Sequence, residues 1–297
     1  MPRYAGNRVR IRMARETTFG IAPSFSAENT LWVRGDGDDF CSLRTGFDQR
    51  VMGTAAGHRR SWLAQAGPAR LVGRLKTWAF PASALELIEW ATAVANNNTQ
   101  SYTVDVDDGH RVLRYLGVKV RRLMISGGAR SKEQAIRLSY ELIGKSQEPL
   151  DSLPSGADEK QIAYTHKNAT IAVDGTVRAN VNRWQIVINN RLRMGSPAGE
   201  QNDWIDLDGR EITAELTSGH EDAALAVAYE SARPIDLRIA IGHSLGTAYQ
   251  LTVDLRSNVR MTSFQVERPL GSIARSRLSL AALLTDSIGE DFRITMG

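Results

Sequence analysis

The sequence predicts a mostly-β (α+β) protein, built as two tandem copies of one antiparallel β-sandwich or open barrel, each with a short flanking helix. Three observations predict this class: segments in which apolar and polar residues alternate, a repeat with a period of about 140 residues, and one helical segment in each half. Alternation is typical of antiparallel strands that bury one face. With 297 residues, the chain is long enough to form two such units.

The repeat rests on five elements that recur in the same order, offset by 140 or 141 residues. In the first copy these are a strand with its glycine turn (30–35), a strand (71–75), a helix beginning at Pro81, an Arg-Leu-Ser triplet (137–139) and an apolar strand (140–143). In the second copy they are 170–175, 212–216, a helix around Leu225, 277–279 and 280–284. Pro81 suits a first helical turn because the N–H that it lacks would have no helical partner there.

The segments between these elements are expected to be strands with antiparallel neighbours. Residues 102–106 alternate and run into Asp107-Asp108-Gly109, a tight-turn signal before the next strand. In that strand, Val118 and Val120 alternate with polar residues. In the second copy, residues 235–241 and 249–255 alternate with a period of two. Sheets with one buried face and one short helix per copy are therefore predicted.

The predicted domains are an N-terminal basic arm (1–24), a first β domain (25–148), a linker (149–164) and a second β domain (165–297). Prolines, a glycine and acidic residues between the copies are typical of a linker. The net charge is +8 over residues 1–150 and −4 over residues 151–297. Much of the positive excess comes from arginines of the arm, at positions 3, 8, 10, 12 and 15. Such an arm suits binding to nucleic acid or to an acidic neighbouring subunit, and equally a solvated terminus.

The composition argues against catalytic and metal chemistry. Cys41 is the only cysteine, so an intramolecular disulfide and a cysteine zinc site are excluded, and Cys41 is expected to be a small packing residue. The five histidines lack metal-ligand spacing, and no phosphate-binding glycine loop is present. No apolar run reaches the roughly 18 residues of a membrane helix, and the N-terminus has no signal-peptide core. The sequence predicts no catalytic, cofactor or metal site, no membrane contact and no enzymatic activity.

One motif imitates a catalytic site. Gly242-His243-Ser244-Leu245-Gly246 matches the G-x-S-x-G turn that holds the nucleophile of serine hydrolases between a strand and a helix. The residues after it alternate as a strand, and no histidine follows His243 to complete the triad order. We interpret the motif as a glycine-rich connection of a β-hairpin, in which Ser244 is not a nucleophile.

Three further segments carry a family resemblance. They are Glu16-Thr17-Thr18-Phe19-Gly20-Ile21-Ala22-Pro23, residues 168–177 with the strand 181–190 that ends in Asn189-Asn190, and Leu207-Asp208-Gly209-Arg210-Glu211-Ile212. They resemble, in this order, the leader segment, the strand–turn–strand and the glycine-basic segment of tail tube (major tail) proteins from long-tailed, siphovirus-like phages. Together they are spread from residue 16 to residue 212, over most of the chain.

The resemblance implies a structural virion protein whose β-sandwich subunits form rings that stack into a tube through which DNA is ejected. Because this chain resembles the duplicated form, we expect a homotrimer with pseudo-hexameric symmetry. The implied partners are further copies of the chain, the tape measure protein, the terminator and the baseplate hub, with double-stranded DNA passing without specific binding. The implied location is the phage tail, and the host cytoplasm during assembly. The expected interlocking loops are residues 49–66 and 192–203.

Two alternatives to a tube subunit stay open. A tail component of the same fold without a tube role, such as a hub or terminator, would share these sequence features. A serine hydrolase would depend on Ser244 alone.

Overall fold

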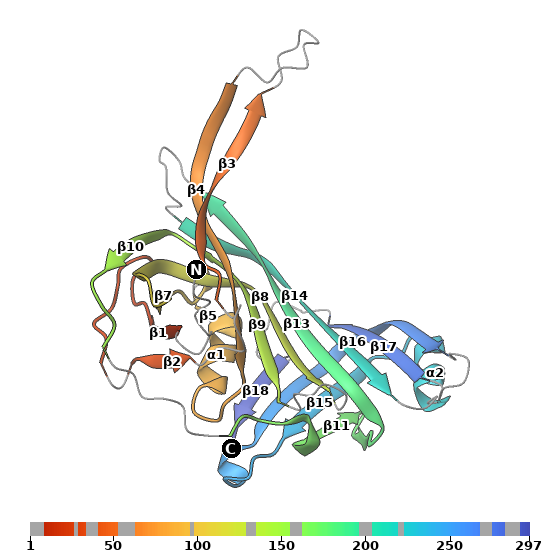
Figure 1. The fold of residues 1–297 in the computed structure, drawn as a ribbon. Coiled ribbons are helices and arrows are strands. Elements are labelled where there is room, and N and C mark those ends of the chain that lie inside the picture. Colours follow the sequence, from red (N-terminus) through yellow and green to blue (C-terminus); the bar gives the residue numbers. More distant parts are fainter. Residues whose placement is uncertain are drawn as a thin grey trace.

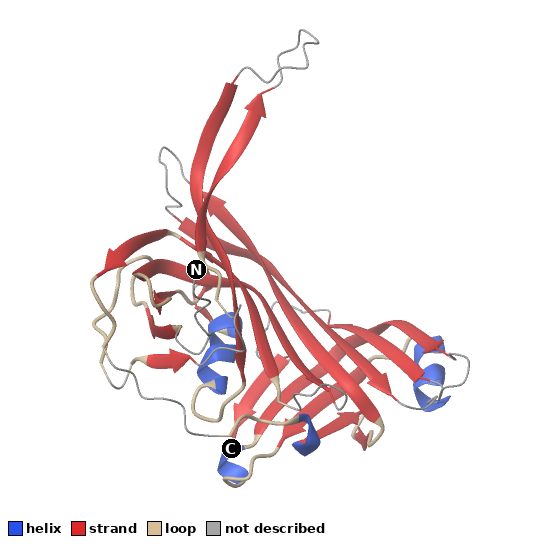
Figure 2. Ribbon diagram, in the orientation of Figure 1, coloured by secondary structure: helices blue, strands red, loops and turns tan. Residues whose placement is uncertain are grey.

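The computed structural model describes residues 9–26, 29–33, 41–52, 63–95, 98–128, 135–154, 162–195, 204–218, 223–267, 275–282 and 292–297. Strands predominate in these segments, and each half has one short α-helix, α1 (Ala84–Thr92) and α2 (Ala223–Glu230) (Figure 2). The predicted mostly-β class with antiparallel strands and a short helix in each half is confirmed.

The first half forms an antiparallel sheet in the order β2-β1-β7-β8-β9-β4-β3, with β10 also paired to β8. Two short strands, β5 (Val94–Ala95) and β6 (Asn98–Thr99), pair separately after α1. The strands of the main sheet are β1 (Arg10–Arg15), β2 (Leu31–Val33), β3 (Arg44–Met52), β4 (Leu63–Trp78), β7 (Tyr102–Asp107), β8 (Val112–Gly128), β9 (Arg137–Gly144) and β10 (Ser146–Leu150).

The second half pairs its strands in the corresponding order, β12-β11-β15-β16-β17-β14-β13, with β18 also paired to β16. Its helix again follows the second strand of a long hairpin, here β14. The strands are β11 (Ala169–Val173), β12 (Thr176–Val177), β13 (Val181–Gly195), β14 (Trp204–Ser218), β15 (Ile235–Ile241), β16 (Leu251–Glu267), β17 (Arg275–Ala282) and β18 (Phe292–Met296).

The pairing corrects two of the sequence equivalences. Thr77 pairs with Leu138, and Leu216 pairs with Leu278, so Leu216 corresponds to Thr77 rather than to Leu75. This slip of two residues leaves each side chain on its predicted face, because side chains alternate with a period of two. Residues 170–173 lie in β11, which holds the place of β1 and not that of β2.

The two halves are not separated into independent sheets. β8 pairs antiparallel with β13, from Asn189 opposite Arg122 to Arg183 opposite Gly128, which makes one sixteen-stranded sheet of the described strands (Figure 1). The strands approach closely at Gly127, where a Cβ atom would lie 2.8 Å from the indole of Trp184. Glycine at this position therefore leaves room for the tryptophan.

The helices cover the apolar face of the sheet. Trp90 of α1 is fully buried between Tyr102 and Tyr140, with ring centroids 5.2 and 5.6 Å away. Its indole N–H donates to the carbonyl of Val118 in β8. In α2, Leu225 and Ala228 are buried. The aromatic rings around Trp90 add to an otherwise mainly aliphatic core.

The described ends of the expected interlocking loops are strands. Met52 pairs with Leu63, and Gly195 pairs with Trp204, so both segments belong to long hairpins, β3–β4 and β13–β14. Figure 1 shows the β3–β4 hairpin projecting from the body of the protein. Residues 53–62 and 196–203 lie outside the described residues. The small and polar residues of these segments suggested loops because the segments lack the alternation of apolar and polar residues that indicates a half-buried strand.

The predicted basic arm includes β1. Arg10 forms an ion pair with Asp107, and Arg12 bonds to Asp105 at 2.9 Å. Asp105 is fully buried and also accepts from Arg114 at 2.8 Å. These arginines are thus engaged within the first half. Arg3 and Arg8 lie outside the described residues.

Candidate functional site, a polar joint and an open sheet face

Four buried or half-buried polar side chains connect the leader, α1 and both halves of the sheet. They are Glu16, Lys119, Asn190 and Arg210, which we call the polar joint. Glu16 and Asn190 bond to β8, Arg210 bonds to Asn190 and to the end of α1, and Lys119, which lies on β8, bonds to β6 and β14.

Glu16 fastens the leader segment to β8. Its buried carboxylate accepts hydrogen bonds from the backbone N–H of Gly20 and Gly117, both at 2.8 Å, and from the Thr103 hydroxyl at 2.9 Å. Gly117 has φ +63°, and a Cβ there would lie 2.7 Å from the Phe19 ring. A left-handed backbone against an aromatic ring requires glycine at this position.

Lys119 links β8 to both β6 and β14. Its ammonium donates to Asn98 Oδ1 at 2.6 Å and to the carbonyl of Ile205, and lies 5.1 Å from the centre of the Phe19 ring. Desolvation lowers the pKa of Lys119 to about 8, although the nearby carboxylates of Asp206 and Glu16 act in the opposite direction. These two hydrogen bonds and the Phe19 ring compensate part of the cost of burying the ammonium.

Asn190 and Arg210 close the C-terminal end of α1 from the second half. Asn190 Nδ2 donates to the carbonyls of Ala91 and Val120, both at 2.9 Å, and its Oδ1 accepts from Arg210 Nε at 2.7 Å. The remaining Arg210 nitrogens donate to the carbonyls of Thr92 at 2.8 Å and Ala91 at 3.1 Å. The last carbonyls of a helix have no helical partner and carry partial negative charge, so a cation stabilises them. Burial lowers the pKa of Arg210 to about 10, so it is charged at neutral pH.

The structure brings together residues from the three segments that carried the family resemblance. Glu16 and Phe19 come from the leader, Asn190 ends the paired asparagines, and Arg210 is the basic residue of the glycine-basic segment. Lys119 was missed, because its position between Val118 and Val120 predicted a solvated face. All three residues are buried there, so the alternation of β8 is interrupted.

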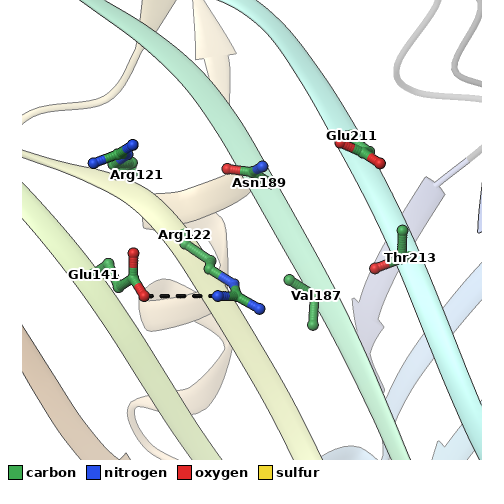
Figure 3. A pocket seen from close by; sticks show the side chains of 7 residues that line it. All are labelled: Arg121, Arg122, Glu141, Val187, Asn189, Glu211 and Thr213. Atoms are coloured by element: carbon green, nitrogen blue, oxygen red, sulfur yellow. Dashed lines mark ion pairs between the residues drawn. The ribbon is translucent and has the colours of Figure 1, made fainter.

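The opposite face of the sheet is open and polar. Tyr140 Oη donates to the Leu87 carbonyl, so Tyr140 faces α1 and its neighbour Glu141 faces away. Strands β8, β9, β13 and β14 together form an open depression of about 370 Å³ on this side (Figure 3). Its lining is Arg121, Arg122, Glu141, Val187, Asn189, Glu211 and Thr213.

Charges on the open face are mixed in sign. Arg122 lies 3.7 Å from Glu141, Arg191 lies 3.5 Å from Glu211, and Arg277 lies 2.6 Å from Glu215. Exposed pairs of this kind add about 0–1 kcal/mol each to stability. Their main effect is on the surface field, because each carboxylate offsets an arginine that would otherwise attract phosphate.

The residues of the hydrolase-like motif form a connection between strands. Ser244 is exposed in the turn between β15 and β16, followed by a short 3-10 helix (Thr247–Tyr249) and not by an α-helix. His243 Nε2 lies 2.7 Å from the Ile162 carbonyl, and its Nδ1 accepts from the Leu245 N–H. Gly246 has φ +118°, as expected for a glycine-rich hairpin connection. Tyr249, predicted as a strand residue, ends the 3-10 helix, and the strand begins at Leu251.

Cys41 is a packing residue. It pairs with Leu75 of β4, and burial raises the pKa of its thiol to about 11, which keeps it protonated and unreactive at neutral pH. Across the described segments, no three histidine, cysteine or carboxylate side chains gather as metal ligands. Neither described α-helix has the length and apolar character needed to cross a membrane.

Alkaline pH is expected to unfold the subunit. Burial raises the pKa of Tyr115 and Tyr164 to about 12 and also raises the pKa of Tyr140, whereas tyrosines of the unfolded chain ionise at about 10. The unfolded state then binds fewer protons, so stability falls as pH rises from about 10. Lys119 has the opposite effect on the free energy of unfolding, which it raises with pH between its folded pKa of about 8 and its unfolded pKa of about 10.4. The net stability is therefore expected to fall only above this range.

Urea titrations at a series of pH values, with phenolate absorbance as a second signal, measure this dependence. Tyr115→Phe should reduce the loss of unfolding free energy between about pH 10 and pH 12. An unfolding free energy that still rises above pH 11 would contradict the assignment of buried, protonated tyrosines.

A family model places these features among known proteins. The model for phage tail tube proteins matches residues 6–273, a span that contains the polar joint, both long hairpins and the pairing of β8 with β13. No curated protein matches the sequence. Because the matched span covers most of both halves, this chain belongs to the phage tail tube protein family.

Proposed function

We propose that this protein is the repeating subunit of a phage tail tube, and that its chains close into rings that stack around a channel for DNA. Membership of the family makes it a structural component of the phage tail. The observation that carries the proposed ring is the pairing of β8 with β13, since it joins one half edge-to-edge with a second half of the same strand order. An interface that repeats head to tail generates a ring when its rotation closes.

We also propose that the halves are two copies of one unit, in residues 25–148 and 165–297, joined by the linker 149–164 and preceded by the basic arm 1–24. The shared strand order supports this. The pairing of β1 with β7 argues for extending the first unit back to Arg10. Each unit is proposed to be a tail-tube-type sandwich or open barrel.

Three chains would then place six equivalent units around one ring. The projecting hairpin β3–β4 and the long hairpin β13–β14 are suited to reach neighbouring rings. The tape measure protein, the terminator and the baseplate hub are the proposed partners inside and at the ends of the tube. Assembly would occur in the host cytoplasm.

The open face is proposed to line the channel. Unpaired cations would hold DNA by displacing its counterions, so a channel that releases DNA needs them offset. The pairing of Arg122 with Glu141 and of Arg277 with Glu215 supports a surface along which DNA passes without specific binding.

Electron microscopy and native mass spectrometry of the purified protein test the proposal. We expect hollow fibres with a regular axial repeat and ring fragments of three chains. Six chains per ring would contradict the pseudo-hexameric trimer. Closed rings that never stack would instead favour a terminator or hub, and a protein that stays monomeric at high concentration would contradict tube assembly altogether.

A further inference from the structure

We propose that the ring closes by backbone pairing of residues 41–43 of one chain with residues 261–264 of β16 in the next chain. The pairing would have the register that β13 and β8 show inside the chain. This inference rests on the proposed ring, and it names the two edges and the residues that meet.

The strand that follows residues 41–43 and the strand β16 are the two outermost strands of one continuous run in the sheet. A run of eight strands has the order β3-β4-β9-β8-β13-β14-β17-β16. Among the described residues, β3 pairs only with β4, and β16 from Arg260 onward pairs only with β17. Open strand edges of this kind pair readily with another chain.

Residues 41–43 hold the place in the first half that residues 186–188 of β13 hold in the second. Cys41 is opposite Leu75, which is opposite Tyr140, whereas Ile186 is opposite Ala214, which is opposite Leu280. Positions 140 and 280 are related by the repeat. Cys41 therefore corresponds to Ile186, Ser42 to Val187 and Leu43 to Ile188.

The edge of β16 corresponds in the same way to that of β8. Leu138 faces Ile125, and Leu278 faces Phe264. Ser139 faces Met124, and Ser279 faces Ser263. Phe264 and Ser263 thus hold the places of Ile125 and Met124.

Within the chain, Ile186 pairs with Ile125, and Val187 pairs with Met124. Applied between chains, these pairs become Cys41 with Phe264 and Ser42 with Ser263. Leu43 would meet Met261, as Ile188 meets Leu123, and Thr262 would stay unpaired because it lies in the bulge of β16 between Met261 and Ser263.

The faces of the two edges match in this register. Cys41, Leu43, Met261 and Phe264 all pack at the apolar core, and Ser42 is exposed on the open face. A shift by one residue would place apolar side chains on the polar face, so the burial pattern selects this register.

The backbone groups have the required direction. The Ser42 N–H donates to the Arg74 carbonyl of β4 at 2.9 Å, so the backbone groups of Cys41 and Leu43 point to the outer edge. The Leu43 carbonyl accepts from Tyr115 Oη at 3.1 Å, and its second lone pair is available to a neighbouring strand.

Disulfide trapping tests the register. In a Cys41→Ala background, Ser42→Cys combined with Ser263→Cys places two thiols at a non-hydrogen-bonded pair, where the Cα atoms are about 4.5 Å apart, within disulfide range. Mild oxidation is expected to give a ladder of linked chains on non-reducing gels that ends at three.

Two matched variants control the trapping. Met124→Cys with Val187→Cys, in the same background, is the corresponding pair inside one chain, and it should oxidise without linking chains. Ser42→Cys with Gln265→Cys moves one thiol by two residues on the same face, and it should link chains at least tenfold less. A mixture of the Ser42→Cys and Ser263→Cys single variants should give linked pairs only, and it keeps the test decisive if the double variant assembles poorly.

The outcomes separate the register from the tube itself. Rings or tubes that form without a bond between positions 42 and 263, while the intrachain control oxidises, would overturn the pairing and leave the tube intact. A higher yield of linked chains from positions 42 and 265 than from positions 42 and 263 would overturn the register. A ladder ending at six would support the pairing and contradict the trimer. Absence of rings for the wild-type protein would defeat the proposed function itself.

Discussion

Replacing Trp184 with alanine is expected to lower the free energy of unfolding by about 3–5 kcal/mol, because the substitution empties a large, fully buried volume at the pairing of β8 with β13. The indole N–H of Trp184 also donates to His166 Nδ1 at 3.1 Å, and that bond is lost. Chemical denaturation of the unassembled subunit measures the change. We expect the same variant to form few or no rings.

Trp204→Ala provides the matched control. Trp204 lies on β14 and is 39% exposed, so its removal should cost about 1 kcal/mol or less. Equal losses for the two variants would show that β8 and β13 do not share a packed core at this point.

Replacing Arg210 with methionine is expected to cost about 3–5 kcal/mol. The variant leaves Asn190 Oδ1 and the carbonyl of Thr92 buried without their donor, and it removes the cation from the end of α1. Arg191→Met is the control, since Arg191 lies on the same hairpin in an exposed pair with Glu211 and should cost about 0–1 kcal/mol.

A double-mutant cycle separates the polar joint from general destabilisation. Asn190→Ala and Arg210→Met remove members of one hydrogen-bond network, so their combined loss should be smaller than the sum by about 1–3 kcal/mol. Strictly additive losses would show that the two side chains act independently.

Local signals in the sequence predicted the short helices and one of the tight turns. The helix predicted after Pro81 is confirmed as α1, but it begins at Ala84, because residues 81–83 form a turn in front of the first helical turn. The turn predicted at Asp107-Asp108-Gly109 forms as expected, with Gly109 at φ +83° and the Asp108 carboxylate accepting from the His110 N–H. Such features depend on residues within a few positions of each other, so a single sequence contains them.

Pairing between distant strands was not predicted. The edges of β8 and β13 carry apolar side chains that would suit several partners, so alternation alone does not select one. The polar joint was missed for a related reason. Glu16, Lys119 and Arg210 are charged residues that a pattern assigns to solvent, and only the distant carbonyls and N–H groups that they satisfy explain their burial.

The continuous pairing of β8 with β13 has a mechanical consequence. Two domains joined only by a linker can move independently of each other. These halves share a ladder of backbone hydrogen bonds from Arg183 to Asn189 and therefore move as one rigid unit. Stress applied along the strands is shared by all the rungs of that ladder. In the proposed tube, such stiff subunits would resist local bending, so a bend of the tube would be distributed over many rings.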